Sequence, residues 1–323
     1  MSRKRKIIFL IGLILFVYVL FSLGKTMKVV EFLNSKILEP MQMPTKEEKE
    51  ALDKNFPFPE QEDQRWDVLI LGIRGRDDPD GGLLSDSIML FSLDKETGQS
   101  SLVSIPRDLF VNLPGLAKGK INEIYEKGIA RRKEIDFSKE SFSRLTGVYI
   151  DNVIVFDFKA FREIVDALEG IDIELKKAFE EKSQWGYEFS LPAGPNHLNG
   201  QDALYFARSR YSTSDFDRSL RQQQIILAIK DKALSAGILS NPLKFGPVLN
   251  SINKNIVTDL NVFDMGHVIK LANAFDAKKN QLKLDHLSTE NILYQTIKDD
   301  LYILQPKDND WKIFREYFKN TLD

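Results

Sequence analysis

The segment Val68-Leu69-Ile70-Leu71-Gly72-Ile73 is a short, uninterrupted apolar run, which is typical of a β-strand covered on both faces. Two further apolar segments, 87–93 and 101–105, lie on either side of the polar stretch 94–99. This order predicts an antiparallel hairpin, and Gly98 suits the bulge of its turn. The first part of the domain is therefore expected to be a sheet.

The next segments alternate strands with helices. Residues 153–156 predict a fourth strand, and the apolar residues between 161 and 168 recur at helical spacing before Gly170, a helix-stopping residue. Residues 171–175 then alternate as a strand. Because hairpins and helical crossovers are mixed, we expect an α/β fold with a mixed, layered sheet and helices on both faces.

Composition narrows the class of protein. The chain has 323 residues, of which 43% are hydrophobic and 28% charged, enough for one large or two modest domains. It has no cysteine, which excludes disulfide scaffolds, thiolate zinc sites and cysteine nucleophiles. The net charge of -2 and the pI near 6.1 argue against a broad nucleic-acid surface, so no nucleic-acid partner is expected.

The N-terminus predicts a membrane anchor. A basic flank, Arg3-Lys4-Arg5-Lys6, precedes an apolar run that extends from Ile7 to Leu23 and is uncharged until Lys25. The length is at the lower limit for crossing a bilayer, and the basic flank predicts a cytoplasmic tail at 1–6, a single-pass anchor at 7–24 and an extracytoplasmic remainder. A cleaved signal peptide is the alternative, although no small-x-small cleavage site follows the run.

The segment after the anchor changes composition. Residues 25–64 contain four prolines after Lys36 and several charged runs, which predicts an extracytoplasmic stalk with a short helix near 46–54. The folded domain is expected to begin near Trp66, as a main domain spanning 65–236.

The remaining residues, 237–323, are expected to form a C-terminal extension. The segment 256–260 precedes a predicted helix at 262–275, and a strand at 301–304 and a helix at 311–318 are predicted after it. We expect this segment either to pack against the main domain or to form a small domain of its own.

Arginines cluster in two separated parts of the sequence. Arg107 follows a predicted strand, and Asn199 is placed to cap a helix that carries Arg208 near its end. A further helix, 217–236, preceded by the capping stretch Thr213-Ser214-Asp215, carries Arg218, Arg221 and Gln222 on one face. Arginine remains charged and offers parallel donors to phosphate, so clustered arginines beside apolar residues suit a phosphate on a lipid-like carrier.

The alternative interpretation is an ordinary solvated helix face. Asp215, Asp217 and Asp231 are near enough in sequence to pair with these arginines. Motif chemistry by itself leaves both interpretations open.

From about Asp67 to Ala233 the chain resembles the LytR-CpsA-Psr (LCP) family of bacterial cell-envelope proteins. The matching segments, in order, are Leu69–Ile73, Ser85–Ser87, Ser104–Asp108, Lys120–Asn122, Pro192–Gly200, Ala203–Arg210, Asp215–Arg218 and Arg221–Gln224. The resemblance covers more than half of the chain and keeps the order and spacing of the motifs.

The resemblance implies a three-layer α/β/α domain with a hydrophobic tunnel for a polyprenyl chain. It implies a phosphotransferase that moves a glycopolymer from an undecaprenyl diphosphate carrier to peptidoglycan, outside the cytoplasmic membrane, with pyrophosphatase as a side activity. Splitting a diphosphate requires cations on its oxygens and an acceptor hydroxyl held in line, which agrees with such a site.

The resemblance also assigns roles by position. Arg107, Arg208, Arg210, Arg218 and Arg221 would bind the diphosphate, Gln222 would assist, and Asp86 would hold Mg²⁺. Arg74, Arg76 and Lys120 are further candidates for substrate binding. Asp86 and Asp108 are the candidates for the general base, which stays unassigned because an aspartate beside an arginine is at least as often its structural partner.

One departure from the family pattern concerns the metal. Members commonly carry an aspartate where this chain has Arg74, and an arginine where it has Arg76. Asp77, Asp78 or Asp80 could replace the missing carboxylate, or be ordinary turn residues, or Arg74 could itself neutralise phosphate. A catalytically impaired polyprenyl-phosphate-binding or scaffold protein is therefore the alternative function.

Overall fold

The fold was analysed in a computed structural model that describes residues 44–75, 82–182, 184, 186–235, 256–260 and 282–322. The expected anchor at 7–24 and the expected helix at 262–275 lie outside these ranges, as do Arg76, Asp77, Asp78 and Asp80. Within the described ranges, no helix combines the length and apolar character needed to span a bilayer.

The centre of the domain is a six-stranded sheet with the strand order β11-β6-β1-β2-β3-β12. The strands are β1 (Arg65–Gly75), β2 (Gly82–Asp94), β3 (Ser100–Ser104), β6 (Asn152–Phe156), β11 (Ile256–Thr258) and β12 (Leu282–His286). Strand β2 is antiparallel to β1 and β3, whereas β6 is parallel to β1 and β12 is parallel to β3. The expectations of a mixed sheet and of a β2–β3 hairpin are confirmed, and Gly98 has the positive φ of 75° that its turn requires.

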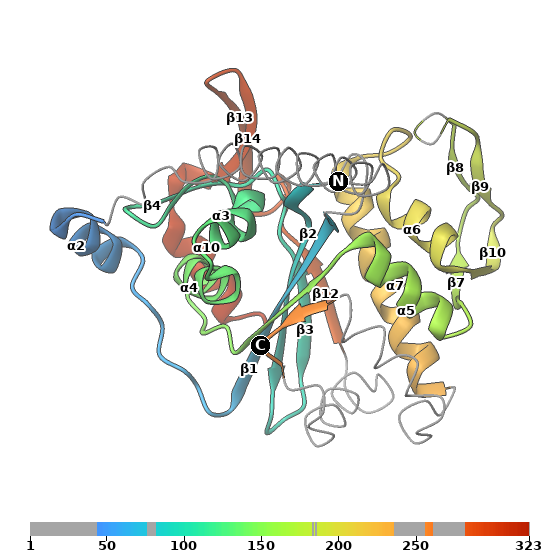
Figure 1. The fold of residues 1–323 in the computed structure, drawn as a ribbon, viewed down its shortest axis with the longest axis horizontal. Coiled ribbons are helices and arrows are strands. Elements are labelled where there is room, and N and C mark those ends of the chain that lie inside the picture. The colour runs from blue at the N-terminus through green and yellow to red at the C-terminus, as the bar shows by residue number, and fades with distance from the viewer. Residues whose placement is uncertain are drawn as a thin grey trace, which may run out of the picture. The chain divides into compact units, whose positions relative to one another are not determined.

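Helices cover both faces of this sheet (Figure 1). One face packs against α3 (Ile124–Ala130), α4 (Glu134–Thr146) and α10 (Trp311–Lys319), and Leu69 and Leu71 of β1 are fully buried there. On the other face Val68 of β1 and Met89 of β2 share an apolar cluster with Ile226 of α7 (Asp215–Ser235). Because successive side chains of a strand point to opposite faces of the sheet, one apolar run contributes residues to both cores. The layered α/β prediction is therefore confirmed.

A second apolar core lies beside the sheet. It joins α5 (Phe158–Ala167), α6 (Gly200–Arg208) and α7 to the two-stranded pair of β7 (Ile171–Leu175) and β10 (Gly194–Leu198). The predicted strand at 171–175 therefore exists but pairs outside the central sheet. A short hairpin, β8 (Phe179–Glu181) and β9 (Phe189–Leu191), follows β7.

The described residues before Trp66, from Pro44 onward, include a helix that packs against the main core. The helix expected near 46–54 is α2 (Lys46–Asn55), with a capping box between Thr45 and Glu48. Its Leu52 and the following Phe56 are each only 6% exposed within the main core, although the surrounding composition is polar. Two apolar side chains thus attach this segment to the main core, although its average composition predicts a stalk.

The described parts of the C-terminal segment belong to the same sheet and core. Strands β11 and β12 form the two edges of the central sheet, and α10 contributes buried Phe314 and Phe318 to the core. The hairpin β13 (Leu293–Lys298) and β14 (Leu301–Pro306) precedes α10, and the hairpin β4 (Phe110–Leu113) and β5 (Ala117–Lys120) lies beside it. Of the two arrangements left open by the sequence, these residues adopt packing against the main domain.

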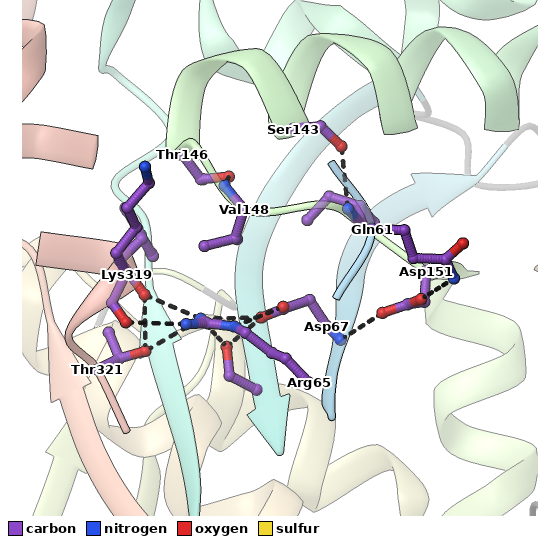
Figure 2. Close-up of polar contacts among 12 residues, drawn as sticks. Gln61, Arg65, Asp67, Ser143, Thr146, Val148, Asp151, Lys319 and Thr321 are labelled. Atoms are coloured by element: carbon purple, nitrogen blue, oxygen red, sulfur yellow. Dashed lines mark hydrogen bonds and ion pairs between the residues drawn. The ribbon is translucent and has the colours of Figure 1, made fainter. Parts of the chain in front are cut away.

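Arg65, at the start of β1, forms a buried ion pair with Asp67 of the same strand and hydrogen bonds with the end of α10 (Figure 2). The Arg65 guanidinium donates to both carboxylate oxygens of Asp67, at 2.7 and 3.1 Å, and to the carbonyls of Phe318 and Lys319, each at 2.9 Å. Burial raises the pKa of Asp67 despite this pairing. The first strand of the sheet and the last helix are thus held by one guanidinium.

Candidate functional site

A cavity of about 520 Å³ lies where β1 and β2 meet α6 and α7. Its walls include seven residues that the sequence nominated for the site: Arg74, Asp86, Arg107, Arg208, Arg210, Arg218 and Gln222. The two arginine-containing parts of the sequence, a hundred residues apart, therefore face one space.

The remaining wall of this arginine pocket is largely apolar. Met89 and Ile226 belong to the cluster on the sheet, whereas Phe161, Leu204 and Ile225 belong to the cluster around α5, α6 and α7. The cavity thus lies between two apolar clusters. A space with guanidinium groups and apolar walls suits an amphiphile that has an anionic head and a hydrocarbon part.

Asp86 on β2 is held between two arginines. Its Oδ1 accepts a hydrogen bond from Arg107 at 2.5 Å, and its Oδ2 lies 3.7 Å from Nε of Arg74. The backbone carbonyl of Asp86 accepts from Arg218 at 3.3 Å. One aspartate therefore orders three of the guanidinium groups around the pocket.

The positions of Arg208 and Arg218 depend on where the helices α6 and α7 begin and end. Asn199 caps α6 by accepting from the Asp202 amide, as predicted, so that Arg208 is the last residue of that helix. Helix α7 begins with a capping box in which the Ser214 hydroxyl accepts from the Asp217 amide and the Asp217 carboxylate accepts from the Ser214 amide. These hydrogen bonds lower the pKa of Asp217.

The β8–β9 hairpin holds the loop between these two helices, a role that no motif in the sequence indicates. The buried Glu181 carboxylate accepts from the amides of Tyr211 and Ser212, and the Gln184 side chain accepts from the Arg210 amide and donates to the Arg208 carbonyl. The arginine loop is thus positioned by contacts 24 to 31 residues distant in sequence.

Arg221 differs from the position expected for it. Its guanidinium donates to the Phe206 carbonyl at 3.0 Å, to the Ser209 carbonyl and to the Thr213 hydroxyl, and it is absent from the pocket walls. Burial lowers its pKa to about 10, so the side chain is still charged at neutral pH. Its contacts favour a positioning role over the predicted direct contact with phosphate.

Asp108 and Lys120 pair with one another. Nζ of Lys120 lies 2.6 Å from the Asp108 carboxylate, which is also 3.7 Å from Nε of Arg107, and neither residue lines the arginine pocket. An aspartate with two cationic neighbours is the structural partner that the sequence allowed as an alternative. The general base stays unassigned.

The described residues do not fit a magnesium site. Mg²⁺ prefers oxygen ligands, and the described walls of the arginine pocket offer one carboxylate, whose two oxygens already face the guanidiniums of Arg107 and Arg74. No group of three or more histidine, aspartate, glutamate or cysteine residues in the described ranges could hold a metal. The predicted ligands Asp77, Asp78 and Asp80 lie outside those ranges.

Several pocket residues had no motif in the sequence to identify them. Gln184 and Tyr211 belong to the hairpin and the loop, and Phe158 lies under Arg208, with the guanidinium 4.0 Å from the ring centroid. Gln201 lies on α6, where helical spacing relative to Arg208 was the only available signal. Tyr205, on the same helix, lies within the matched segment Ala203–Arg210, which gave it no role.

Comparison with known proteins finds a matching family and relatives over most of the chain. The model of the LytR_cpsA_psr family matches residues 30–314. The teichoic acid transferase TagU of Bacillus cereus is 30% identical over 244 residues, covering 72% of this chain and 73% of the relative. TagU of Enterococcus faecalis is 27% identical over 308 residues, covering 93% and 94%.

The fold also has solved counterparts. The crystal structure of Bacillus subtilis TagV aligns with a TM-score of 0.62 at 26% identity, covering 81% of this chain and 99% of the other. The family match, which extends beyond β14 into α10, includes the C-terminal segment as well as the arginine motifs. The chain belongs to the LytR-CpsA-Psr family.

Proposed function

We propose that this protein is a phosphotransferase that moves an anionic glycopolymer from a polyprenyl diphosphate carrier, of the undecaprenyl type, to peptidoglycan. The supporting observation is the arginine pocket, in which five arginines and one aspartate stand beside apolar walls. The relatives from Bacillus and Enterococcus are named as polyisoprenyl-teichoic acid–peptidoglycan teichoic acid transferases, which supports the same class of donor and acceptor.

The chemistry that this pocket supports is a displacement at phosphorus. A hydroxyl of the acceptor glycan attacks the phosphorus that carries the glycopolymer, the bond from that phosphorus to the bridging oxygen breaks, and polyprenyl phosphate leaves with the electron pair. The hydroxyl proton passes to a general base. Arg107 and Arg218 stabilise the charge that develops on the phosphate oxygens, because both guanidiniums are ordered by Asp86 before substrate binds.

Water in place of the acceptor hydroxyl would give pyrophosphatase as a side activity. The membrane location belongs to the same proposal: the basic and apolar run at the N-terminus supports a single-pass anchor with the domain on the outer face of the cytoplasmic membrane. A carrier lipid would then meet the apolar walls of the arginine pocket at the membrane where it resides.

The decisive experiment measures release of polyprenyl phosphate from a polyprenyl diphosphate-linked saccharide by the full-length chain, with peptidoglycan as acceptor. We expect Arg107→Ala and Arg218→Ala each to reduce turnover by about a hundredfold or more, as loss of transition-state charge stabilisation does elsewhere. Arg132→Ala is the matched control, since Arg132 is exposed and outside the pocket.

Unchanged turnover in both pocket variants would reject the transferase assignment. Tight binding of the carrier without turnover, even with acceptor present, would favour the scaffold function instead. Arg74, at the place where relatives are expected to carry a metal ligand, is the observation that keeps this second function in the test.

A further inference from the structure

The pairing of Asp86 is unequal on its two sides. Arg107 makes a hydrogen bond of 2.5 Å to Oδ1, whereas Nε of Arg74 is 3.7 Å from Oδ2, beyond hydrogen-bond distance. The Arg74 side chain is also the more exposed of the two arginines, at 34% compared with 21%. Arg74 is therefore the guanidinium that can turn to an incoming anion without first losing a hydrogen bond to Asp86.

The charge balance of the arginine pocket is strongly positive without a metal. Its described walls carry five arginines and one carboxylate. A diphosphate diester brings about two negative charges, which these guanidiniums can neutralise by charge-assisted hydrogen bonds. A divalent cation beside Asp86 would instead meet two guanidiniums within a few ångströms, and like charges at that distance repel.

We infer that this chain binds its diphosphate without a divalent metal, with Arg74 supplying the positive charge at the position expected for a metal ligand. This inference rests on the proposed function, because it concerns the diphosphate of that same reaction. Arg107 stays on Asp86 and is fixed by it, while Arg74 transfers from Asp86 to a phosphate oxygen. The planar fork of Arg74 also orients that phosphate, which a hydrated cation does less directly.

Reciprocal variants of the full-length chain test this inference. We would measure binding of farnesyl diphosphate calorimetrically, in EDTA and in Mg²⁺, and count bound Mn²⁺ by electron paramagnetic resonance. For the natural chain we expect binding in EDTA and no protein-bound Mn²⁺. Arg74→Gln should bind about tenfold more weakly in both conditions, because one charge-assisted hydrogen bond is lost.

Arg74→Asp is the informative counterpart, since it places a second carboxylate near Asp86. We expect this variant to bind little farnesyl diphosphate in EDTA. When divalent metal is added, it should recover binding of the diphosphate and bind one Mn²⁺ per chain. Binding by the natural chain only with metal would overturn the inference and direct attention to Asp77, Asp78 and Asp80. Absence of binding under every condition would instead count against the proposed function itself.

A second observation, on another part of the molecule, carries a separate proposal. A groove of about 530 Å³ lies among α2, β4, the β13–β14 hairpin and α10. Four cations line it, Lys54, Lys298, Lys312 and Arg315, and within the described ranges none of them forms an ion pair. Among the described residues of the groove the single carboxylate is Asp310, which caps α10 by accepting from the Lys312 amide at 2.8 Å and attracts Arg315.

Aromatic rings form part of the same groove. Phe110 and Trp311 are half-buried in its walls, and Nζ of Lys298 lies 4.1 Å from the Phe110 ring centroid. Arg315 is fixed by donating to the Asn55 carbonyl at 2.7 Å. Aromatic side chains suit the apolar faces of sugar rings, and the lysines, which form no ion pair in the described ranges, suit carboxylates. The two features together select an anionic glycan over a bare polyanion.

We propose that this groove binds a glycan strand that carries carboxylates. The probe is soluble peptidoglycan strands with the full-length chain, in saturating pyrophosphate so that the arginine pocket is occupied. We expect Lys54→Glu/Lys312→Glu to weaken binding at least about fivefold at low salt, because two exposed attractions become repulsions. Lys176→Glu/Lys177→Glu, an equal charge change on an exposed turn outside the groove, should have no effect.

Equal affinities of the two double variants would overturn this proposal, and so would failure of the natural chain to bind the strands. Poly(glycerol phosphate) is the second probe, since it has charge but no sugar rings. Binding of that polymer at the same strength would show that the groove responds to charge alone and would also contradict the proposal. Neither result bears on turnover at the arginine pocket.

Discussion

At the scale of single residues, arginine serves two purposes in this protein. Arg107 and Arg218 face the arginine pocket, whereas Arg221 donates to backbone carbonyls at the end of α6 and Arg65 pairs with Asp67 inside the core. The guanidinium suits both uses because it stays charged and has donors in a fixed plane. Sequence proximity does not separate them, since Arg218 and Arg221 lie one helical turn apart.

The role of Arg221 is tested by Arg221→Met, which keeps the apolar stem. We expect the free energy of unfolding to fall by about 2–3 kcal/mol, because three acceptors lose a charged donor. Denaturant titration measures the change, and Arg210→Met, a variant of a half-buried pocket residue on the same loop, serves as control. Unchanged stability with loss of pyrophosphate binding would show that Arg221 contacts the ligand directly.

At the scale of elements, the capping box of α7 determines where the helix begins and therefore where Arg218 lies. We expect Ser214→Ala to cost about 1 kcal/mol of stability at neutral pH, as the loss of an N-cap typically does. The exposed Ser190→Ala on β9 is the control. Thermal unfolding followed by circular dichroism measures both.

The capping box of α7 also predicts that the stability of the fold depends on pH. The Asp217 pKa is lowered below its ordinary value of 3.8 by hydrogen bonds from Ser214. A depressed carboxyl pKa stabilises the fold above the unfolded value and loses that contribution as the pH falls through the folded value. The difference in unfolding free energy between the natural chain and Asp217→Asn should therefore be present at pH 6 and shrink below pH 3.8; a constant difference would contradict it.

The β8–β9 hairpin is the other element on which the arginine loop depends. Glu181→Gln replaces one acceptor oxygen by a donor facing the amides of Tyr211 and Ser212, which are donors themselves. We expect pyrophosphate binding to weaken about tenfold, since Arg210 loses its fixed position. Glu180→Gln, on the exposed face of the same hairpin, is the matched control, and equal binding by both variants would remove this role from the hairpin.

At the scale of the whole molecule, segments far apart in the sequence are joined by buried polar contacts. Arg65→Met removes the guanidinium that joins β1 to the end of α10 and leaves the Asp67 carboxylate buried without it (Figure 2). We expect a loss of about 3–5 kcal/mol in unfolding free energy, whereas Arg65→Met/Asp67→Leu should recover most of it. A double-mutant cycle in denaturant measures the coupling, and additive effects would show that the two residues act independently.

The sequence by itself determined the features that depend on neighbours along the chain. The hairpin turn at Gly98 and the Asn199 cap follow from local spacing, because their hydrogen bonds join residues a few positions apart. The strand at 68–73 follows from its uninterrupted apolar run, although its hydrogen-bond partners lie on distant strands. The order of the arginine motifs was likewise sufficient to recognise the family. The α/β class followed from the same local patterns.

Only the tertiary structure decided which of these residues meet. Arg74 and Arg107 converge on Asp86 because β1, β2 and the end of β3 are adjacent in the sheet, and Glu181 reaches the arginine loop across a separate hairpin. Leu52 and Phe56 likewise pack into the core, although they belong to a segment of polar composition. Such contacts depend on packing between segments far apart in sequence, and the free energy of that packing is not encoded in any local pattern.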